Sequence, residues 1–333
     1  MPHYPGRDSG YRPRPRPGFA RDEFVAPAGA PRPRGFVPAP RPGQAPGQPA
    51  PNPKPAAAAP RRAIVSAATA EGLAESTRTR PAFDEIKLCG LAAVRARFDR
   101  DPGSILRLFF DEATAPRVGT ISKALAAAKR IYRQVEPAEL EKIAGSIHHG
   151  GIVAVVRAPV LQRVSPAELA KWAASGEAVL VLDRIGNAHN LGAIARTTAF
   201  FGVPRIIIPD SAAAARPSDS AHRVAEGGLE QVEVWLAPDL VALARDLAAA
   251  GYEVVGAATR GAISLRTKPK RDPDAPRKPI AIVLGNEEQG LAPNLAAACS
   301  RLVTIPGTGK IESLNVSVAA GVLLWELVMR RSQ

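Results

Sequence analysis

Downstream of Ala178 the chain alternates short apolar runs with longer helical stretches. The apolar runs predict strands at residues 178–182, 205–209, 253–257, 280–284 and 302–305. The stretches between and after them predict helices near residues 191–201, 239–250, 291–299 and 313–330. A further run, Val232–Trp235, is either an edge strand or a connection. Strands that alternate with helices in this way predict a mostly parallel sheet with both faces covered.

A smaller α/β pattern precedes this one. From about Phe83, apolar clusters alternate with amphipathic runs, as in EIKLCGLAAVRARF, SILRLFFDEA and ISKALAAAKRIYRQV. The pattern ends in an apolar strand, Ile152–Val156. We therefore expect a small α/β domain over residues 83–157, a linker with one short helix over 158–177, and a larger α/β domain over 178–333.

The first 80 residues show neither pattern. Residues 1–62 hold 17 of the 33 prolines and 11 basic against 3 acidic side chains, which is much of the chain's net charge of +13. Such sequence favours extended, solvated backbone, because it has too few apolar residues to form a core. We predict a disordered basic tail over residues 1–80. It either solubilises the chain or adds salt-sensitive affinity for RNA or DNA.

Composition also restricts the compartment and the partners. Cys89 and Cys299 are the only cysteines, which is not the framework of a disulfide-rich secreted module. The sequence contains no Cys/His cluster, so it gives no support for a structural zinc site. The longest strongly apolar run, Val316–Met329, is shorter than the roughly 20 residues that a bilayer requires, and it contains Glu326. We expect a cytoplasmic protein without a metal or a membrane partner.

Ligands of parallel α/β sheets bind at the carboxyl ends of strands, and three loops there carry glycine and polar residues. In the first loop, Asn187–Gly202, Asn190 is placed to cap a helix that starts near Leu191. Arg196 lies about a turn and a half into that helix. A planar cation at this place would suit a phosphate. The alternative is an ordinary solvated arginine on a surface helix.

The second loop, Leu284–Leu291, follows an apolar strand. Gly285 allows a ligand to approach the backbone closely, and Glu287 places a carboxylate at the strand end. The alternative is a plain strand-to-helix turn in which acidic residues stabilise the helix N-terminus.

The third loop, Ile305–Ser317, contains two glycines and leads into an almost entirely apolar helix. Ser313 is the predicted cap of that helix, and Asn315 and Ser317 are predicted to lie on its first turn. A helix that is apolar all round is a buried one, so these polar groups need partners. The loop lacks the residues that a Walker A motif or a dinucleotide-binding fingerprint requires, which argues against nucleotide hydrolysis and a Rossmann dehydrogenase.

In order and spacing, NAHNLGAIARTTAFFG, IVLGNEEQGL and IPGTGKIESLNVSVAAGVLLWE resemble the three motifs of the SpoU (TrmH-type) RNA 2′-O-methyltransferases of the SPOUT class. The resemblance implies transfer of a methyl group from S-adenosylmethionine to a ribose 2′-hydroxyl of tRNA or rRNA. It also implies a trefoil-knotted α/β catalytic domain, an exception to the rule that chains avoid knots, and a homodimer through that domain. Residues 83–157 resemble the upstream RNA substrate-binding domain of this family, which is of the ribosomal protein L30e type.

The resemblance also implies which residues act. Asn190 and Arg196 match the first motif, Glu287 matches the second, and Ser313 and Asn315 match the third. These five are the expected catalytic residues. Arg196 is expected to clamp the phosphate beside the target ribose, although family proposals also give it a role in deprotonation. Glu287 and Asn315 would then fix Arg196 or the ribose.

The cofactor contacts of the family fall on Gly285, Ile305 and Leu314, largely through backbone groups. A rival hypothesis from another class is a non-catalytic RNA-binding protein that kept the fold. The presence of Arg196, Glu287 and Asn315 argues against it.

Overall fold

The computed structural model describes residues 84–267 and 277–330, and all of them belong to one compact unit, Ala74–Gln333. The predicted basic tail, residues 1–80, therefore lies outside the described residues. Within the described part, no helix is both long and apolar enough to cross a membrane.

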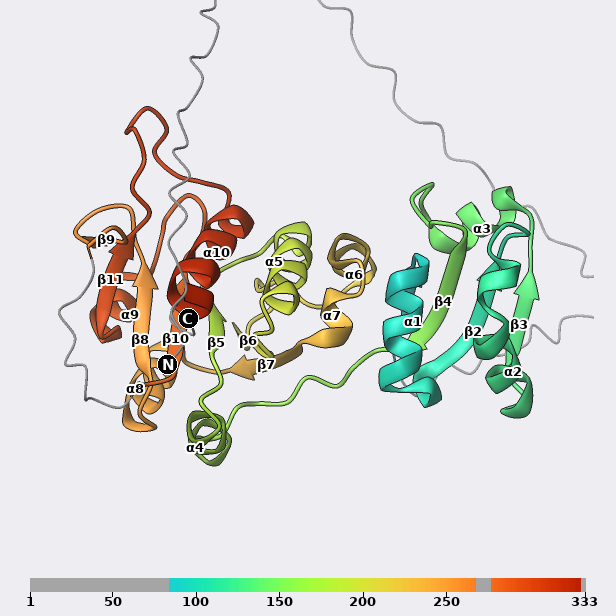
Figure 1. Ribbon diagram of the computed structural model, residues 1–333, viewed down its shortest axis with the longest axis horizontal. Helices are drawn as coiled ribbons and strands as arrows, with labels where there is room; N and C mark the ends of the chain where they lie inside the picture. The colour runs from blue at the N-terminus through green and yellow to red at the C-terminus, as the bar shows by residue number, and fades with distance from the viewer. Residues whose placement is uncertain (1–83, 268–276, 331–333) are drawn as a thin grey trace, which may run out of the picture. The chain divides into compact units, whose positions relative to one another are not determined.

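The first sheet is small and mixed (Figure 1). Its strands are β1 (Glu85–Cys89), β2 (Ile105–Phe110), β3 (Ile131–Gln134) and β4 (Ile152–Arg157). Its helices are α1 (Leu91–Arg100), α2 (Gly119–Ala127) and α3 (Pro137–Ala144), with short 3-10 turns at Pro102–Ser104 and Ala115–Arg117. The strand order is β1-β4-β2-β3, and β4 is antiparallel to both of its neighbours. The expected small α/β fold is present here.

The second sheet has seven strands in the order β7-β6-β5-β10-β8-β11-β9. The strands are β5 (Val179–Leu182), β6 (Arg205–Pro209), β7 (Glu233–Ala237), β8 (Glu253–Ala257), β9 (Ile263–Ser264), β10 (Ile280–Leu284) and β11 (Arg301–Thr304). Every neighbouring pair is parallel, which confirms the predicted parallel sheet. The run at Val232–Trp235 belongs to an edge strand, β7, from Glu233 onward, while the short edge strand β9 was not predicted.

Helices cover both faces of this sheet (Figure 1). They are α4 (Pro166–Ala174), α5 (Ala188–Phe200), α6 (Asp219–Ala225), α7 (Gly228–Gln231), α8 (Leu240–Ala249), α9 (Pro293–Ala298) and α10 (Val316–Leu324), followed by a π-helical turn, Trp325–Met329. Alternate residues of β5 point to opposite faces. Leu180 and Leu182 pack with α5 and α10, whereas Val179 and Val181 pack with α4 and α8. Both faces of the central strands are therefore core.

Two helices have N-terminal caps other than those predicted. The cap of α5 is Asn187, whose side chain accepts a hydrogen bond from the His189 backbone N–H at 2.8 Å, so the prediction that Asn190 caps this helix is wrong. The cap of α10 is Asn315, which accepts from the Ser317 backbone N–H at 2.9 Å. Ser313 is consequently not a cap. In each case an asparagine next to the first helical turn satisfies a backbone donor that the helix leaves open.

One face of α10 is exposed, although the sequence predicted a helix buried all round. Ala320 and Leu323 are fully buried, but Val318, Val322 and Trp325 remain 53 %, 37 % and 47 % exposed. An apolar sequence contains no information on whether a face meets the protein's own core or another surface.

A buried ion cluster joins α1 to α7. Arg97 donates from Nη2 to Glu230 Oε1 at 2.9 Å, and His222 Nδ1 lies 3.2 Å from the same oxygen. All three residues are buried. Burial raises the pKa of the Glu230 carboxyl, but the hydrogen bond from His222 and the charge of Arg97 outweigh this effect, so the pKa lies below its usual 4.5. The cluster therefore depends on an ionised Glu230.

Candidate active site

Three loops leave the same edge of the parallel sheet. Because β5, β10, β8 and β11 run parallel as successive neighbours, the carboxyl ends of β5, β10 and β11 share one edge (Figure 1). The ends of β5 and β10 are also joined, since the Asp183 backbone N–H donates to the Leu284 carbonyl at 2.7 Å. The loops after these strands carry the first, second and third sequence motifs. The edge is therefore the place where the fold gathers the predicted site.

A chain of side chains links all three loops. Asn190, in the first turn of α5, donates from Nδ2 to Glu287 Oε1 in the second loop. Asn315, at the start of α10, donates from Nδ2 to Asn190 Oδ1 at 3.2 Å. The carboxylate only accepts, while each amide both donates and accepts. Three residues that lie up to 125 positions apart in sequence thus form one polar cluster.

Arg196 does not join this cluster. Its Nη1 lies 2.8 Å from Oε1 of Glu226, and both side chains are more than half exposed. Glu226 lies between α6 and α7 with a left-handed φ of 45°. Of the two expected roles of Glu287 and Asn315, contact with Arg196 is not made in this structure, and orientation of the ribose stays a prediction. The guanidinium is instead held at the surface, where an exposed partner can be exchanged for another anion.

The backbone at Arg196 is packed tightly against α7. A Cβ on Gly228 would lie 2.6 Å from the Arg196 Cα, which is closer than any side chain tolerates. Gly228 therefore lets α7 approach α5 at the position of Arg196. Close backbone packing fixes where the Arg196 side chain starts, even though its far end is exposed.

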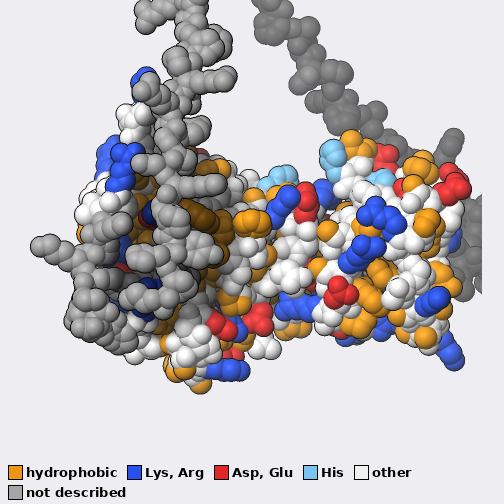
Figure 2. Space-filling model, in the orientation of Figure 1, with side chains coloured by type: hydrophobic (Ala, Val, Ile, Leu, Met, Phe, Trp, Pro, Cys, Tyr) orange, Lys and Arg blue, Asp and Glu red, His pale blue; other side chains and the backbone are white. Residues whose placement is uncertain are grey.

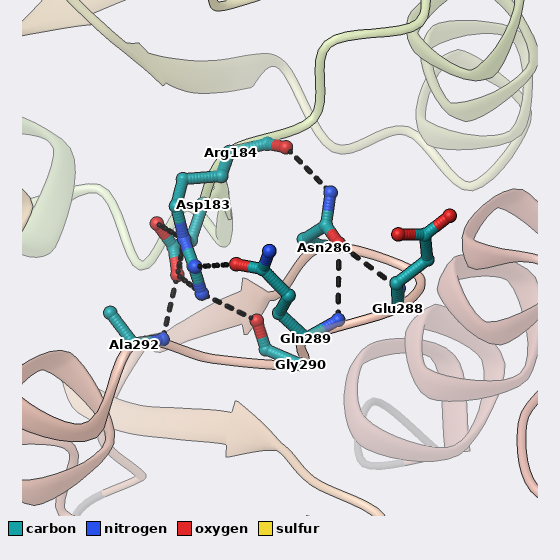
Figure 3. A network of polar contacts seen from close by, with 7 residues as sticks. All are labelled: Asp183, Arg184, Asn286, Glu288, Gln289, Gly290 and Ala292. Atoms are coloured by element: carbon teal, nitrogen blue, oxygen red, sulfur yellow. Dashed lines mark hydrogen bonds and ion pairs between the residues drawn. The ribbon is translucent and has the colours of Figure 1, made fainter.

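The second loop is braced from β5 (Figure 3). Arg184, the second residue after β5, donates to the Gln289 side chain and to the Gly290 carbonyl, at 2.6 and 2.8 Å. Asp183 is 4 % exposed and accepts from the Ala292 backbone N–H at 2.9 Å. These contacts hold the end of the loop against the neighbouring strand.

The second loop folds back closely upon itself. A Cβ on Gly285 would lie 2.5 Å from the Gly290 carbonyl oxygen and nearer still to the Gly290 carbonyl carbon and the Leu291 nitrogen. All three atoms belong to the backbone, so no flexible side chain can give way. Only glycine permits this approach.

The third loop leaves its backbone open. Between Ile305 and Leu314 no backbone hydrogen bond is made to another described residue, apart from the Lys310 N–H, which donates to Thr308 Oγ1 at 3.4 Å. Leu314 is 47 % exposed, and the exposed Ser313 makes no side-chain hydrogen bond within the described part of the chain. The loop therefore offers backbone donors and acceptors together with an apolar side chain.

These features fit a nucleoside such as that of S-adenosylmethionine. Such a ligand needs apolar surface and a few well-placed backbone groups. The open backbone near Ile305 and Leu314 provides them, and Gly285 keeps the facing loop compact. A metal site has no comparable support, since no group of three or more His, Cys, Asp or Glu in the described ranges is arranged to hold an ion.

Sequence reasoning missed Arg184 and Glu226 as members of the site. Nothing in the local sequence shows that Arg184 reaches the loop after the neighbouring strand. Glu226 meets Arg196 only because α6 packs against α5. Neither pairing has a sequence signal, because both depend on tertiary packing.

Comparison with known families places both sheets. Residues 177–325 match the SpoU rRNA Methylase family, and residues 87–162 match the family described as RNA 2′-O ribose methyltransferase substrate binding.

Individual proteins show the same similarity. The chain is 35 % identical over 247 residues to YfiF of Escherichia coli O157:H7, an uncharacterized tRNA/rRNA methyltransferase, covering 73 % of this chain and 68 % of YfiF. It is 32 % identical over 247 residues to the 23S rRNA (guanosine-2′-O-)-methyltransferase RlmB of Nitrosomonas europaea, covering 73 % and 91 % of the two chains. The crystal structure of an AdoMet-bound rRNA methyltransferase from Sinorhizobium meliloti superimposes with a TM-score of 0.59 at 26 % identity, over 74 % of this chain and 87 % of that one.

Proposed function

Because the chain belongs to the SpoU family of RNA 2′-O-ribose methyltransferases, we propose that the residues gathered at the three loops carry out the transfer. The protein is an S-adenosylmethionine-dependent enzyme that methylates a ribose 2′-hydroxyl of rRNA or tRNA. The proposed catalytic residues are Asn190, Arg196, Glu287, Ser313 and Asn315. The observation that carries the proposal is the chain of contacts from Asn315 through Asn190 to Glu287.

The proposed cofactor contacts are at Gly285, Ile305 and Leu314. S-adenosylmethionine supplies, when bound, a methyl carbon attached to a positively charged sulfur. Gly285 keeps the second loop folded back, and the open backbone around Ile305 and Leu314 binds the nucleoside. Most of the rate enhancement then comes from holding the ribose oxygen in line with the methyl carbon.

Arg196 acts as a clamp for the phosphate beside the target ribose. A guanidinium is planar and always charged, so it binds a phosphate well and accepts a proton poorly. Its ion pair with Glu226 is exposed on both sides, and such pairs contribute little net stability. An RNA phosphate can therefore replace Glu226 as the partner of Arg196 with little loss of stability. Asn190, Glu287 and Asn315 orient the ribose, and the exposed Ser313 hydroxyl is available to the same substrate.

A different role is proposed for each of the two sheets. Residues 83–157 form the proposed RNA substrate-binding domain, residues 158–177 the linker, and residues 178–333 the catalytic domain, with the cofactor loops in the trefoil knot that the resemblance implies. Cys89 and Cys299 are both free thiols, which suits the reducing cytoplasm.

The catalytic domain is proposed to form a homodimer through α5 and α10. Val318, Val322 and Trp325 form an exposed apolar face, and Phe200 beside them is 82 % exposed. Figure 2 shows hydrophobic side chains in the part of the molecule where Figure 1 places α10 and α5. Phe201 continues the face, with its ring 6.3 Å from that of Trp325. A second copy of the chain would bury this surface.

Replacement of Arg196 by alanine tests the proposed mechanism. We expect methyl transfer to cellular RNA from a deletion strain to fall by at least about 10²-fold, because the ribose is no longer positioned. Calorimetry should show unchanged S-adenosylmethionine affinity, since Arg196 contacts none of the cofactor loops. The matched control is Arg330→Ala, which removes another exposed, ion-paired arginine.

Two results would contradict the proposal. Full activity of Arg196→Ala in a tritiated-methyl assay would remove Arg196 from the mechanism. Cofactor binding by the wild-type protein, without transfer to any cellular RNA, would favour the non-catalytic RNA-binding alternative.

A further inference from the structure

Arg184 has an unusual backbone for an arginine. It lies two residues after β5 with a φ of 56°, in the left-handed region that side chains rarely adopt. Conformations of this kind persist where surrounding contacts fix them, and they gather at functional sites. The contacts that hold Arg184 in this conformation therefore point to a functional role.

The Arg184 guanidinium reaches across to the loop after β10 (Figure 3). Nη1 donates to the Gln289 side chain at 2.6 Å, and Nη2 donates to the Gly290 carbonyl at 2.8 Å. Both Nε and Nη2 also face the Asp183 carboxylate at 3.2 Å. The Asp183 carboxylate thus fixes the guanidinium, while Nη1 and Nη2 hold the loop.

The same two residues hold the rest of the loop. The Arg184 carbonyl accepts from Asn286 Nδ2 at 3.1 Å, at the beginning of the loop. The buried Asp183 carboxylate accepts from the Ala292 N–H, just beyond its end. The strands before these segments, β5 and β10, are themselves paired in parallel in the middle of the sheet, so the contacts of Asp183 and Arg184 start from a fixed backbone.

The braced segment is the one that carries site residues. Glu287 lies between Asn286 and Gly290, which Arg184 holds, and Gly285 lies between Asn286 and Leu284, whose carbonyl accepts from the Asp183 N–H at 2.7 Å. Asn286 also pairs with Gly290 across the turn. We propose that Arg184 is a positioning residue that holds the loop Gly285–Gly290 in the shape that binds S-adenosylmethionine. The inference rests on the proposed function, because that function assigns the cofactor contact to Gly285.

The test uses three variants, two at Arg184 and one at Gln289. Arg184→Gly removes every contact of the guanidinium and relieves the left-handed backbone, so it spares folding. Arg184→Lys keeps a cation beside Asp183 but cannot hold both loop acceptors. Gln289→Ala removes one acceptor from an exposed residue and leaves Arg184 in place.

The matched control is Arg216→Lys. Arg216 is similarly exposed, at 36 % against 40 % for Arg184, and it likewise pairs with an aspartate that follows a strand, Asp210. Its other contact is the Ser211 carbonyl, outside the three loops.

The readouts are S-adenosylmethionine affinity by calorimetry, the two Michaelis constants with kcat, and the melting temperature. For Arg184→Gly we expect the dissociation constant and KM for S-adenosylmethionine to rise about tenfold, the effect of losing one net hydrogen bond to a charged group. Arg184→Lys and Gln289→Ala should shift both in the same direction by less. Arg216→Lys should leave both unchanged, and the KM for RNA should stay constant in all variants.

Three outcomes would overturn the inference. The first is a lowered melting temperature with unchanged cofactor affinity, which indicates a merely structural role. The second is a raised KM for RNA alone, which makes Arg184 an RNA contact. The third is wild-type affinity in both Arg184→Lys and Gln289→Ala. Cofactor affinity is measured without methyl transfer, so these failures are distinct from a failure of Arg196 as the catalytic clamp.

Discussion

Gly285→Ala adds a single methyl group at the tightest point of the second loop. The new Cβ would lie 2.5 Å from the Gly290 carbonyl oxygen and closer to two further backbone atoms. Ordinary van der Waals contact begins near 3.4 Å. The loop therefore has to open by roughly 1 Å, because backbone atoms cannot rotate away as a side chain can.

The magnitude follows from that displacement. Overpacking of this kind costs about 1–3 kcal/mol. If the cost falls on the shape that binds S-adenosylmethionine, its dissociation constant rises by about 5- to 150-fold. Gly290→Ala, in the same loop, is the matched control. Gly290 has a φ of 66° and nothing within 4 Å of an added Cβ, so alanine there meets backbone strain without a clash.

Calorimetric titration with S-adenosylmethionine distinguishes the two variants, and thermal unfolding shows whether each one folds. We expect Gly285→Ala to lose more affinity than Gly290→Ala. Wild-type affinity in Gly285→Ala would refute the reasoning, because the close approach would then have no bearing on cofactor binding. Equal losses in the two variants would show that loop strain in general, rather than the contact at Gly285, controls affinity.

Two further predictions concern stability and assembly. The pKa of Glu230 is lowered in the folded chain, so its contribution to the free energy of unfolding is present above the unfolded pKa near 4.5 and is lost as the pH falls through the folded pKa. The loss of stability in acid should therefore become less steep in Glu230→Gln. At neutral pH the free energy of unfolding of this variant should fall by on the order of 3 kcal/mol, since Arg97 is left buried without its partner. Glu326→Gln, at an exposed pair, should lower it by less than about 1 kcal/mol. Equal losses in the two variants would contradict the role of burial. Light scattering should find a dimer in the wild type and a monomer in Val322→Glu, and a monomeric wild type at micromolar concentration would disprove the proposed homodimer.

The sequence predicted the parallel sheet well, because regular alternation of strands and helices leaves few other folds. Element ends were less accurate where two polar residues competed. Asn187 and Asn190 are both good helix caps, and only the fold shows that Asn190 is engaged by Glu287, 97 residues away. Asn315 and Ser313 presented the same ambiguity before α10.

The predicted site came together in part. Asn190, Glu287 and Asn315 meet as the motif order suggested, while Arg196 pairs with Glu226 instead of Glu287. The partner of Arg196 could not be predicted, because Glu226 belongs to a short turn with no pattern of its own. Arg184 was missed for a related reason: its left-handed backbone and its reach to Gly290 are properties of the packed loops.

The strand order has a consequence for how the protein is made. β10 lies between β5 and β8, yet it is synthesised after both, about 100 residues behind β5. The nascent chain can pair β5 with β6 and β7 early, but β8 has no neighbour until β10 or β11 emerges from the ribosome. Pairings so distant in sequence form slowly. The second loop follows β10 directly and the third comes later still, so the cofactor site is completed only after both of these late segments have been synthesised.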